Sequence, residues 1–522
     1  MTAIWSKPST RLADLCAVLL ILLISAVTAA IGAVHTRIFG HDIFIFLDAG
    51  WRVLNGQRPE INFNPSMGPL LSLLSAAGLK LAHNSPNGIG YMSALVGGIA
   101  GCWAYAISRR RMAAIPATLA GIVVALIATA PFPIGWPPNV LSHAMLYNRY
   151  GYALLGLVVL ECFQPGQSTL IGGVSTGVVS VALLFLKPSY CLVALGFAAC
   201  SVVIEQRGLR RILGIAIGLS AAGLAMMAYL RFDFAAFGSD LRLMSAARSS
   251  SLSLWNVRWS LFKGLGDFLP LALLAVLASS LTLRLRPLLV TALVWIGGAL
   301  LLATNAQPSG YPLNALLALL LVEQGRAAIA RVSWNAPRFP KPETVLILLG
   351  LICYAPIAIG DASGLAYALV DSHRNPPVAR FHATPLRNLI LYDTPDGTDA
   401  DQRSNGRAYV DYVNDGVDLI QRVSKPDQTV FTLDMVNPFP YALLRRPPEG
   451  GTPALAFNHT FNDQHKPSPK WLFGSADIVM VPKHPASSEP DAAALFRNYL
   501  PAIQSKFTLC AESDWWKLYR RR

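Results

Sequence analysis

Two carboxylates near the beginning of the chain are the first residues whose type and position could perform chemistry. Asp42 and Asp48 lie in the stretch Gly40–Pro59, directly after the first long apolar segment. A carboxylate beside the hydrocarbon layer of a membrane is costly unless it has a role. There it can act as a general base that takes a proton from a hydroxyl group. We therefore expect Asp42 and Asp48 to be catalytic candidates.

Each of these acids also has a structural explanation that the sequence leaves open. Asp42 precedes the position where a helix is expected to begin, and Asp is a favoured N-cap residue. Asp48 lies four residues before Arg52, so the two side chains can form an ion pair on one helix face. His41 could orient Asp42, contact a substrate or bind a metal, although a lone His beside a cap is more often structural.

The composition places most of the chain in a membrane. The chain has 522 residues, of which 53% are hydrophobic and 14% charged, whereas soluble domains carry about 25% charged residues. The net charge is +14, but Lys and Arg are scattered through short loops between apolar runs, which indicates membrane topology and not nucleic-acid binding. The expected spans are 12–34, 88–107, 112–130, 146–163, 169–186, 189–204, 212–230, 268–283, 288–304, 312–328 and 344–360.

The predicted fold is mainly α, a polytopic membrane helical bundle with a C-terminal extracytoplasmic α/β domain. Residues 1–360 form the membrane module, with a first outer loop at 35–87, and residues 361–522 form the α/β domain. The apolar segment 66–81 is too short to cross and is expected to lie in the outer interface. In the polar region we expect helices at 409–423 and 490–504, buried strands at 429–433 and 477–481, and a closing hairpin at 507–519.

The first outer loop resembles that of the GT-C glycosyltransferases, membrane enzymes that use polyprenyl-phosphate sugars. The shared pattern is an Asp after the first span, an amphipathic helix, an Asn-Gly turn and a Pro-containing second helix that starts at the Gly-Pro-Leu-Leu run 68–71. In the lipid A aminoarabinose transferases, which look similar here, a second acidic residue follows six positions after the first, as Asp48 follows Asp42. The resemblance implies an inverting transferase with Asp42 as base.

The same resemblance implies the substrates and the location. The donor would be a polyprenyl-phosphate sugar and the acceptor a lipid or glycan hydroxyl of the cell envelope. The protein would be a multi-pass inner-membrane protein with a cytoplasmic N-terminus and a periplasmic or extracellular C-terminal domain. It would need no cofactor and no nucleic acid, and no metal-ligand spacing is present, although a divalent metal is not excluded.

Such a transfer needs cations that stabilise the leaving phosphate. Two candidates, Arg149 and Lys187, lie at the expected outer ends of apolar segments. The third is Arg258, which lies in the expected external loop 231–266, where the resemblance implies contact with the carrier phosphate. A Lys at the position of Lys187 either faces a cavity or snorkels to the interface. In the polar tail, the loop Asp434–Tyr441 could cover the active site or bind the acceptor, or form an ordinary turn.

Two other functions remain open from the sequence. A lipid or glycan transporter would show interrupted helices and charges near the membrane centre, whereas the polar residues here gather at one face. A non-catalytic membrane scaffold would use the external domain to bind a partner. An Asp42→Asn variant that folds but loses function would separate an enzyme from a scaffold.

Overall fold

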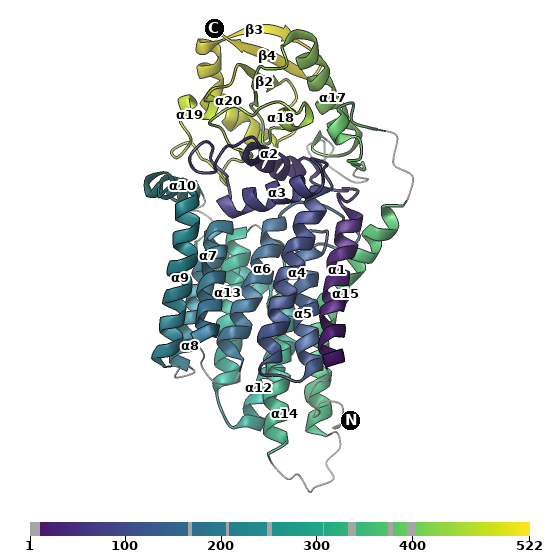
Figure 1. The fold of residues 1–522 in the computed structure, drawn as a ribbon, viewed down its shortest axis with the longest axis vertical. Coiled ribbons are helices and arrows are strands. Elements are labelled where there is room, and N and C mark those ends of the chain that lie inside the picture. The colour runs from purple at the N-terminus through teal and green to yellow at the C-terminus, as the bar shows by residue number, and fades with distance from the viewer. Residues whose placement is uncertain are drawn as a thin grey trace.

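The computed structural model describes residues 11–164, 170–204, 208–247, 253–305, 307–331, 341–373, 379–393 and 403–522. Within these ranges the chain forms a bundle of long helices with an α/β domain stacked on one end (Figure 1). We call that end of the bundle the domain end. The predicted fold class is therefore confirmed.

Eleven of the described helices coincide with the predicted spans. They are α1 (Arg11–Ile31), α4 (Gly88–Arg109), α5 (Ala114–Thr129), α6 (Leu146–Phe163), α7 (Leu170–Leu186), α8 (Pro188–Ile204), α9 (Leu209–Tyr229), α12 (Leu265–Thr282), α13 (Arg286–Asn305), α14 (Leu313–Ile329) and α15 (Pro342–Asp371). Six of them, α1, α4, α9, α12, α13 and α15, are long and apolar enough to cross a membrane. The chain is thus a multi-pass membrane protein. The last helix, α15, continues past its predicted end at Gly360 to Asp371.

Glycines allow two of the bundle helices to pack backbone against backbone. A Cβ at Gly173 of α7 would lie 2.4 Å from the carbonyl oxygen of Arg211, and one at Gly214 of α9 would lie 2.2 Å from that of Leu170. Without a water-driven force between helices in lipid, close van der Waals packing through small residues holds neighbouring helices together. These glycines therefore fix α9 against α7.

Several shorter helices lie at the domain end. They are η2 (Gly40–Asp42), α2 (Ile43–Leu54), α3 (Pro69–Leu81), α10 (Phe234–Ala247) and α11 (Leu254–Lys263). Figure 1 shows α2 and α3 lying across the ends of the bundle helices. With 13 residues, α3 reaches about 20 Å at 1.5 Å per residue. As predicted, it does not run through the bundle. The segment 231–266, expected only as an external loop, instead contains α10 and α11.

The α/β domain contains a four-stranded sheet and several helices. The strands are β1 (Val430–Thr432), β2 (Ile478–Pro482), β3 (Phe507–Glu512) and β4 (Trp516–Arg521), in the order β1-β2-β4-β3. The helices are η4 (Thr384–Leu386), α17 (Gly406–Val423), α18 (Phe439–Ala442), α19 (Pro469–Phe473) and α20 (Glu489–Lys506). β1 and β2 are parallel, whereas β2 with β4 and β3 with β4 are antiparallel. The predicted strands, helices and closing hairpin of this region are confirmed.

Both faces of strand β2 are buried. Ile478 and Met480 of β2 join the core that includes α17, whereas Val479 and Val481 join the core that includes α20. This alternation follows from the two-residue period of a strand. The core on the α17 side is continuous with the packed residues of α2, such as Phe44. The sheet domain is therefore packed onto the membrane module.

Candidate active site at the domain end

A mostly apolar pocket with a lysine in its wall lies at the domain end. Its cavity volume is about 260 Å³, and it is lined by side chains of α8, α10 and α13 together with Ser66, Met67 and Lys187. Leu241 and Met244 of α10 and Leu300 of α13 supply apolar walls. A cation at the edge of an apolar cavity matches a molecule with an anionic head and a hydrocarbon tail.

Lys187 is held at this pocket by the geometry of the chain around it. It lies between the end of α7 at Leu186 and the start of α8 at Pro188, because proline is favoured in the first turn of a helix. The side chain is 4% exposed. Its Nζ donates to the Oδ1 of Asn148 at 3.1 Å and lies 4.4 Å from the ring centroid of Tyr147. These two neutral partners orient the buried ammonium group at the pocket.

Asp42 occupies the junction between the membrane module and the α/β domain. It lies in η2 directly before α2, but its side chain makes no capping hydrogen bond, so capping does not account for this carboxylate. The Oδ1 of Asp42 lies 3.1 Å from the Nε2 of His41. Asp42 does not line the Lys187 pocket. The expectation that both flank one reacting carbon stays a prediction.

His41 links the Asp42 carboxylate to the α/β domain. Its Nδ1 lies 3.3 Å from the carbonyl oxygen of Ser404, so an imidazolium would donate one N–H to Ser404 and the other to Asp42. Burial by itself would lower the pKa of His41, but Asp42 and the Ser404 carbonyl outweigh it, and the pKa is raised. His41 therefore serves to orient Asp42.

Tyr409 of α17 belongs to the same cluster, although the sequence indicated only a helix at this position and no site residue. Its ring centroid lies 6.4 Å from that of His41. Burial, and then the carboxylates of Asp434 and Asp42, raise the pKa of Tyr409 well above its usual value. Its buried hydroxyl has no hydrogen-bond partner within the described residues. Buried hydroxyls are normally paired, so this hydroxyl is an exception that the described contacts do not explain.

Asp48 forms the ion pair that its spacing allowed. Its Oδ2 accepts from the Nε of Arg52 at 2.8 Å, and both side chains are fully buried. Burial raises the pKa of Asp48 even though Arg52 opposes that effect. The Nη1 of Arg52 also donates to the carbonyl oxygens of Pro448 and Gly450. Through Arg52, Asp48 thus connects α2 to the α/β domain, and its catalytic role stays a prediction.

The other two candidate cations occupy different environments. The Nη1 of Arg149 donates to Asp361 of α15 at 3.1 Å, and its Nε donates to the carbonyl oxygen of Phe132 at 2.5 Å. Arg149 is therefore part of a buried ion pair inside the bundle. Arg258 lies exposed on α11, with its guanidinium carbon 5.9 Å from the ring centroid of Trp255. Of the three candidates, only Lys187 lines the apolar pocket.

The loop Asp434–Tyr441 is engaged in internal contacts. Asp434 accepts from the hydroxyl of Tyr412 at 2.5 Å and from the backbone N–H groups of Ala486 and Ser487. The hydroxyl of Tyr441 donates to the carbonyl oxygen of Asn84. These contacts stabilise the domain and leave neither Asp434 nor Tyr441 exposed for the acceptor contact that the sequence suggested.

Beside the pocket, two acidic groups that the sequence did not single out lie against each other. Glu60, in the loop before α3, is 4% exposed and faces Asp240 of α10. Burial and the neighbouring Asp240 raise the pKa of Glu60 to about 11. Glu60 therefore keeps its proton at neutral pH, which allows it to sit against Asp240. Because Leu241 of α10 lines the pocket, this pair positions one wall of the cavity.

These features define a multi-pass membrane protein with an apolar pocket that has Lys187 in its wall. A separate cluster of His41, Asp42 and Tyr409 lies at the contact with the α/β domain. No family model matches the chain, and a comparison with curated proteins found no match. Among solved structures, the crystal structure of ArnT from Cupriavidus metallidurans in the apo state is similar, with 13% identity, a TM-score of 0.47, and 96% of this chain and 97% of that chain covered. ArnT bound to undecaprenyl phosphate has the same identity and coverage and a TM-score of 0.48. At this level the likeness establishes neither family nor function for this chain.

Proposed function

We propose that the protein is a glycosyltransferase that moves a sugar from a polyprenyl-phosphate carrier to a hydroxyl of a cell-envelope lipid or glycan. The observation that carries this proposal is the position of Lys187 in the wall of a mostly apolar pocket at the domain end. A polyprenyl phosphate has the matching chemistry, an anionic head on a long isoprenoid chain. The membrane-embedded bundle gives such a lipid direct access to the pocket.

The reaction assigns different roles to the two parts of the site. Asp42 takes the proton from the acceptor hydroxyl, whose oxygen attacks the anomeric carbon of the sugar. The bond between that carbon and the phosphate oxygen breaks, and the polyprenyl phosphate leaves with the electron pair. Lys187 stabilises the charge that develops on the phosphate. A single displacement of this kind inverts the anomeric configuration.

His41 and Tyr409 support this assignment. His41 holds the Asp42 carboxylate through its Nε2 and is itself anchored to Ser404 of the α/β domain. The hydroxyl of Tyr409, which has no hydrogen-bond partner in the described part of the chain, lies in the same cluster and can bind a hydroxyl of the acceptor or the sugar. We further propose that the domain end faces the periplasm or the cell exterior, where an envelope acceptor would be found.

Binding of a C55 polyprenyl monophosphate to the detergent-solubilised protein tests the role of Lys187. We expect Lys187→Ala to weaken binding at least about tenfold, which corresponds to ~1.4 kcal/mol. Lys187→Arg should retain most of the affinity. Lys263→Ala, which removes an exposed lysine of α11, is the matched control and should bind normally. The uncharged C55 polyprenol should bind weakly to all of them.

Release of polyprenyl phosphate from a polyprenyl-phosphate sugar, measured by mass spectrometry, tests the transfer itself. The proposal fails if Lys187→Ala binds the phosphate as tightly as the unaltered protein. It also fails if the uncharged polyprenol binds as well as its phosphate, because the cation would then have no part in recognition.

A further inference from the structure

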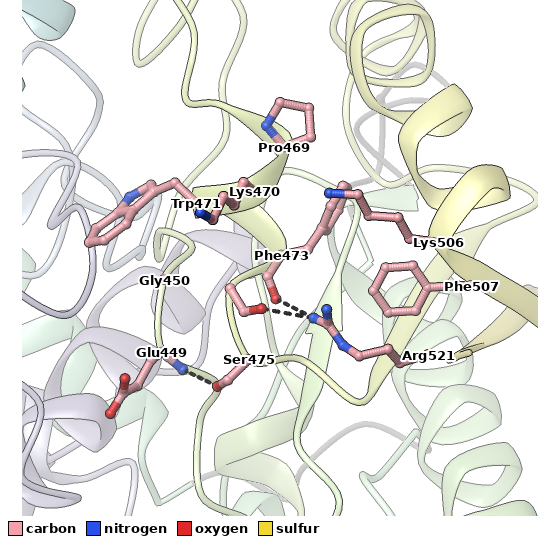
Figure 2. A pocket seen from close by; sticks show the side chains of 11 residues that line it. Glu449, Gly450, Pro469, Lys470, Trp471, Phe473, Ser475, Lys506, Phe507 and Arg521 are labelled. Atoms are coloured by element: carbon pink, nitrogen blue, oxygen red, sulfur yellow. Dashed lines mark hydrogen bonds between the residues drawn. The ribbon is translucent and has the colours of Figure 1, made fainter.

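A second pocket, on the α/β domain, is built differently from the Lys187 pocket. Its cavity volume is about 620 Å³, and it lies between the segment 469–475, the loop at Glu449 and Gly450, and the strand ends at Phe507 and Arg521. Figure 2 shows side chains from these three parts of the domain surrounding one space. The wall that carries Lys187 is made of bundle helices, so the two pockets are distinct sites.

The charges of this second pocket favour an anion. Lys470, Lys506 and Arg521 line it, and Glu449 is its one acidic lining residue. The carboxylate of Glu449 lies 3.7 Å from Arg446, and Figure 2 shows it on the opposite side of the drawn residues from Lys506. Within the described residues, neither lysine side chain makes an ion pair or a hydrogen bond. Two ammonium groups are therefore available to a ligand.

Arg521 gives the pocket a fixed charge. Its Nη2 donates to the carbonyl oxygen of Gly474 at 2.8 Å, its Nε donates to that of Ala476 at 2.8 Å, and its guanidinium carbon lies 4.9 Å from the ring centroid of Phe507. These contacts hold the guanidinium in place beside the cavity (Figure 2). A positioned arginine costs less ordering entropy on binding than a mobile one.

An exposed tryptophan adds a flat apolar face. Trp471 is 38% exposed, and the side chain of Ser468 fixes its backbone by accepting from its N–H at 3.2 Å. A partly exposed aromatic ring suits the C–H face of a sugar ring, whereas the surrounding cations suit carboxylate or phosphate groups. The combination is the chemistry of an anionic saccharide.

The far side of the pocket wall is connected to the first loop of the membrane module. The N–H of Gly450 donates to the carbonyl oxygen of Asn62 at 2.6 Å, and the N–H of Asn64 donates to that of Gly451 at 3.0 Å. That loop continues directly to Ser66 and Met67 of the Lys187 pocket. The Gly450 wall of the second pocket is therefore hydrogen-bonded to the loop that continues to the first pocket.

We propose that the pocket lined by Lys470, Trp471, Lys506 and Arg521 binds an anionic saccharide and recognises the acceptor. The acceptor role rests on the proposed function. The bound sugar carries carboxylate or phosphate groups and belongs either to a glycolipid or to a free glycan.

Equilibrium binding to the full-length detergent-solubilised protein tests the site. The probe is trigalacturonic acid, followed by quenching of tryptophan fluorescence and by calorimetry, with neutral maltotriose as the comparison. We expect trigalacturonic acid to bind, and Lys470→Ala/Lys506→Ala to weaken its binding at least about tenfold. Trp471→Ala should weaken binding of the probe and abolish the quenching, whereas Trp471→Phe should retain most of the affinity. Arg422→Ala/Lys425→Ala removes the same charge from exposed positions at the end of α17 and should have no effect.

Three results would overturn the proposal. The first is equal affinity for maltotriose and trigalacturonic acid, and the second is equal loss of affinity in the α17 control. The third is that an acidic peptide such as triglutamate, or inorganic phosphate alone, binds as tightly as trigalacturonic acid. The pocket would then recognise negative charge and not a saccharide. If the natural ligand is part of a glycolipid, an anionic glycolipid should compete with trigalacturonic acid. If it is a free glycan, an anionic polysaccharide should compete instead. If the saccharide proposal is wrong, binding of polyprenyl phosphate should still depend on Lys187. If the proposed function is wrong, binding of polyprenyl phosphate should not depend on Lys187, whereas binding of trigalacturonic acid to the second pocket would be unaffected.

Discussion

Asp48 and Arg52 form a completely buried ion pair of 2.8 Å, whereas Asp42, six residues earlier in η2, lies 3.1 Å from His41. The first pair joins α2 to the carbonyl oxygens of Pro448 and Gly450 in the α/β domain. Asp42 makes no capping hydrogen bond. The two acids that the sequence suggested for catalysis thus have different partners, an arginine for Asp48 and a histidine for Asp42.

Asp42→Asn should abolish most of the transfer while leaving the protein folded. The amide cannot accept the acceptor proton, so we expect turnover to fall by roughly 10²–10⁴-fold, the usual contribution of a general base. Binding of C55 polyprenyl monophosphate should stay unchanged. Initial rates and equilibrium binding on the same preparation measure both quantities.

The control for this substitution is Asp48→Asn, which leaves Arg52 buried without its counterion. It should lower the free energy of unfolding by about 3–5 kcal/mol and should be detected as a lower Tm. If Asp42→Asn instead lowers Tm as strongly and keeps its turnover per folded molecule, Asp42 is structural and the scaffold alternative leads.

The pair of His41 and Asp42 should make stability depend on pH. The pKa of His41 is raised in the folded protein above its ordinary 6.5, so its charged form is favoured by folding. The resulting stabilisation is complete below pH 6.5 and is lost as pH rises through the raised folded pKa. In Tm measurements across roughly pH 5 to 9, the unaltered protein should lose more stability in this window than His41→Gln, which does not titrate.

Asp42→Asn removes the partner of His41 and should flatten the same pH profile. A separate kinetic readout shows whether His41 positions the base, because His41→Gln should then lower kcat with little change in KM for the donor. Identical pH profiles for the unaltered protein and both variants would contradict the ion pair.

Glu60→Gln should stabilise the protein at neutral and alkaline pH. Burial and Asp240 raise the pKa of Glu60 from 4.5 to about 11, so the folded state holds a proton that the unfolded state has lost between these values. Stability therefore falls as pH rises from about 4.5 toward 11. Glutamine keeps the shape and cannot ionise, so Glu60→Gln should show a weaker decline of Tm with pH.

Glu343→Gln provides a control for Glu60, because Glu343 is a partly exposed acid at the start of α15. With Glu343→Gln, Tm should decline with rising pH as steeply as in the unaltered protein. The pairing of Glu60 with Asp240 would be contradicted if Glu60→Gln and Glu343→Gln gave the same profile.

Cys510 can report on which side of the membrane the α/β domain lies. It is an exposed free cysteine in β3, whereas Cys16, the other exposed cysteine in the described part of the chain, lies in the span α1. A membrane-impermeant maleimide should label intact cells or spheroplasts, and Cys510→Ser should remove the labelling. Labelling of Cys510 only after permeabilisation would place the domain in the cytoplasm and contradict the proposed orientation.

The sequence determined the parts of this protein that depend on local patterns. Apolar runs of membrane length located the bundle helices, because backbone groups in lipid must be paired within each segment. Strand and helix periods located the elements of the α/β domain. The pair of Asp48 and Arg52 could be predicted because residues four apart lie on one helix face.

Only the tertiary structure decided which distant residues meet. Arg149 pairs with Asp361, Glu60 faces Asp240, and His41 contacts Ser404, and each of these pairs is far apart in the sequence. The walls of both pockets likewise come from segments separated by long stretches of chain. Short-range periodicity sets which face of an element is apolar, but the packing of whole elements decides which polar groups those faces bring together.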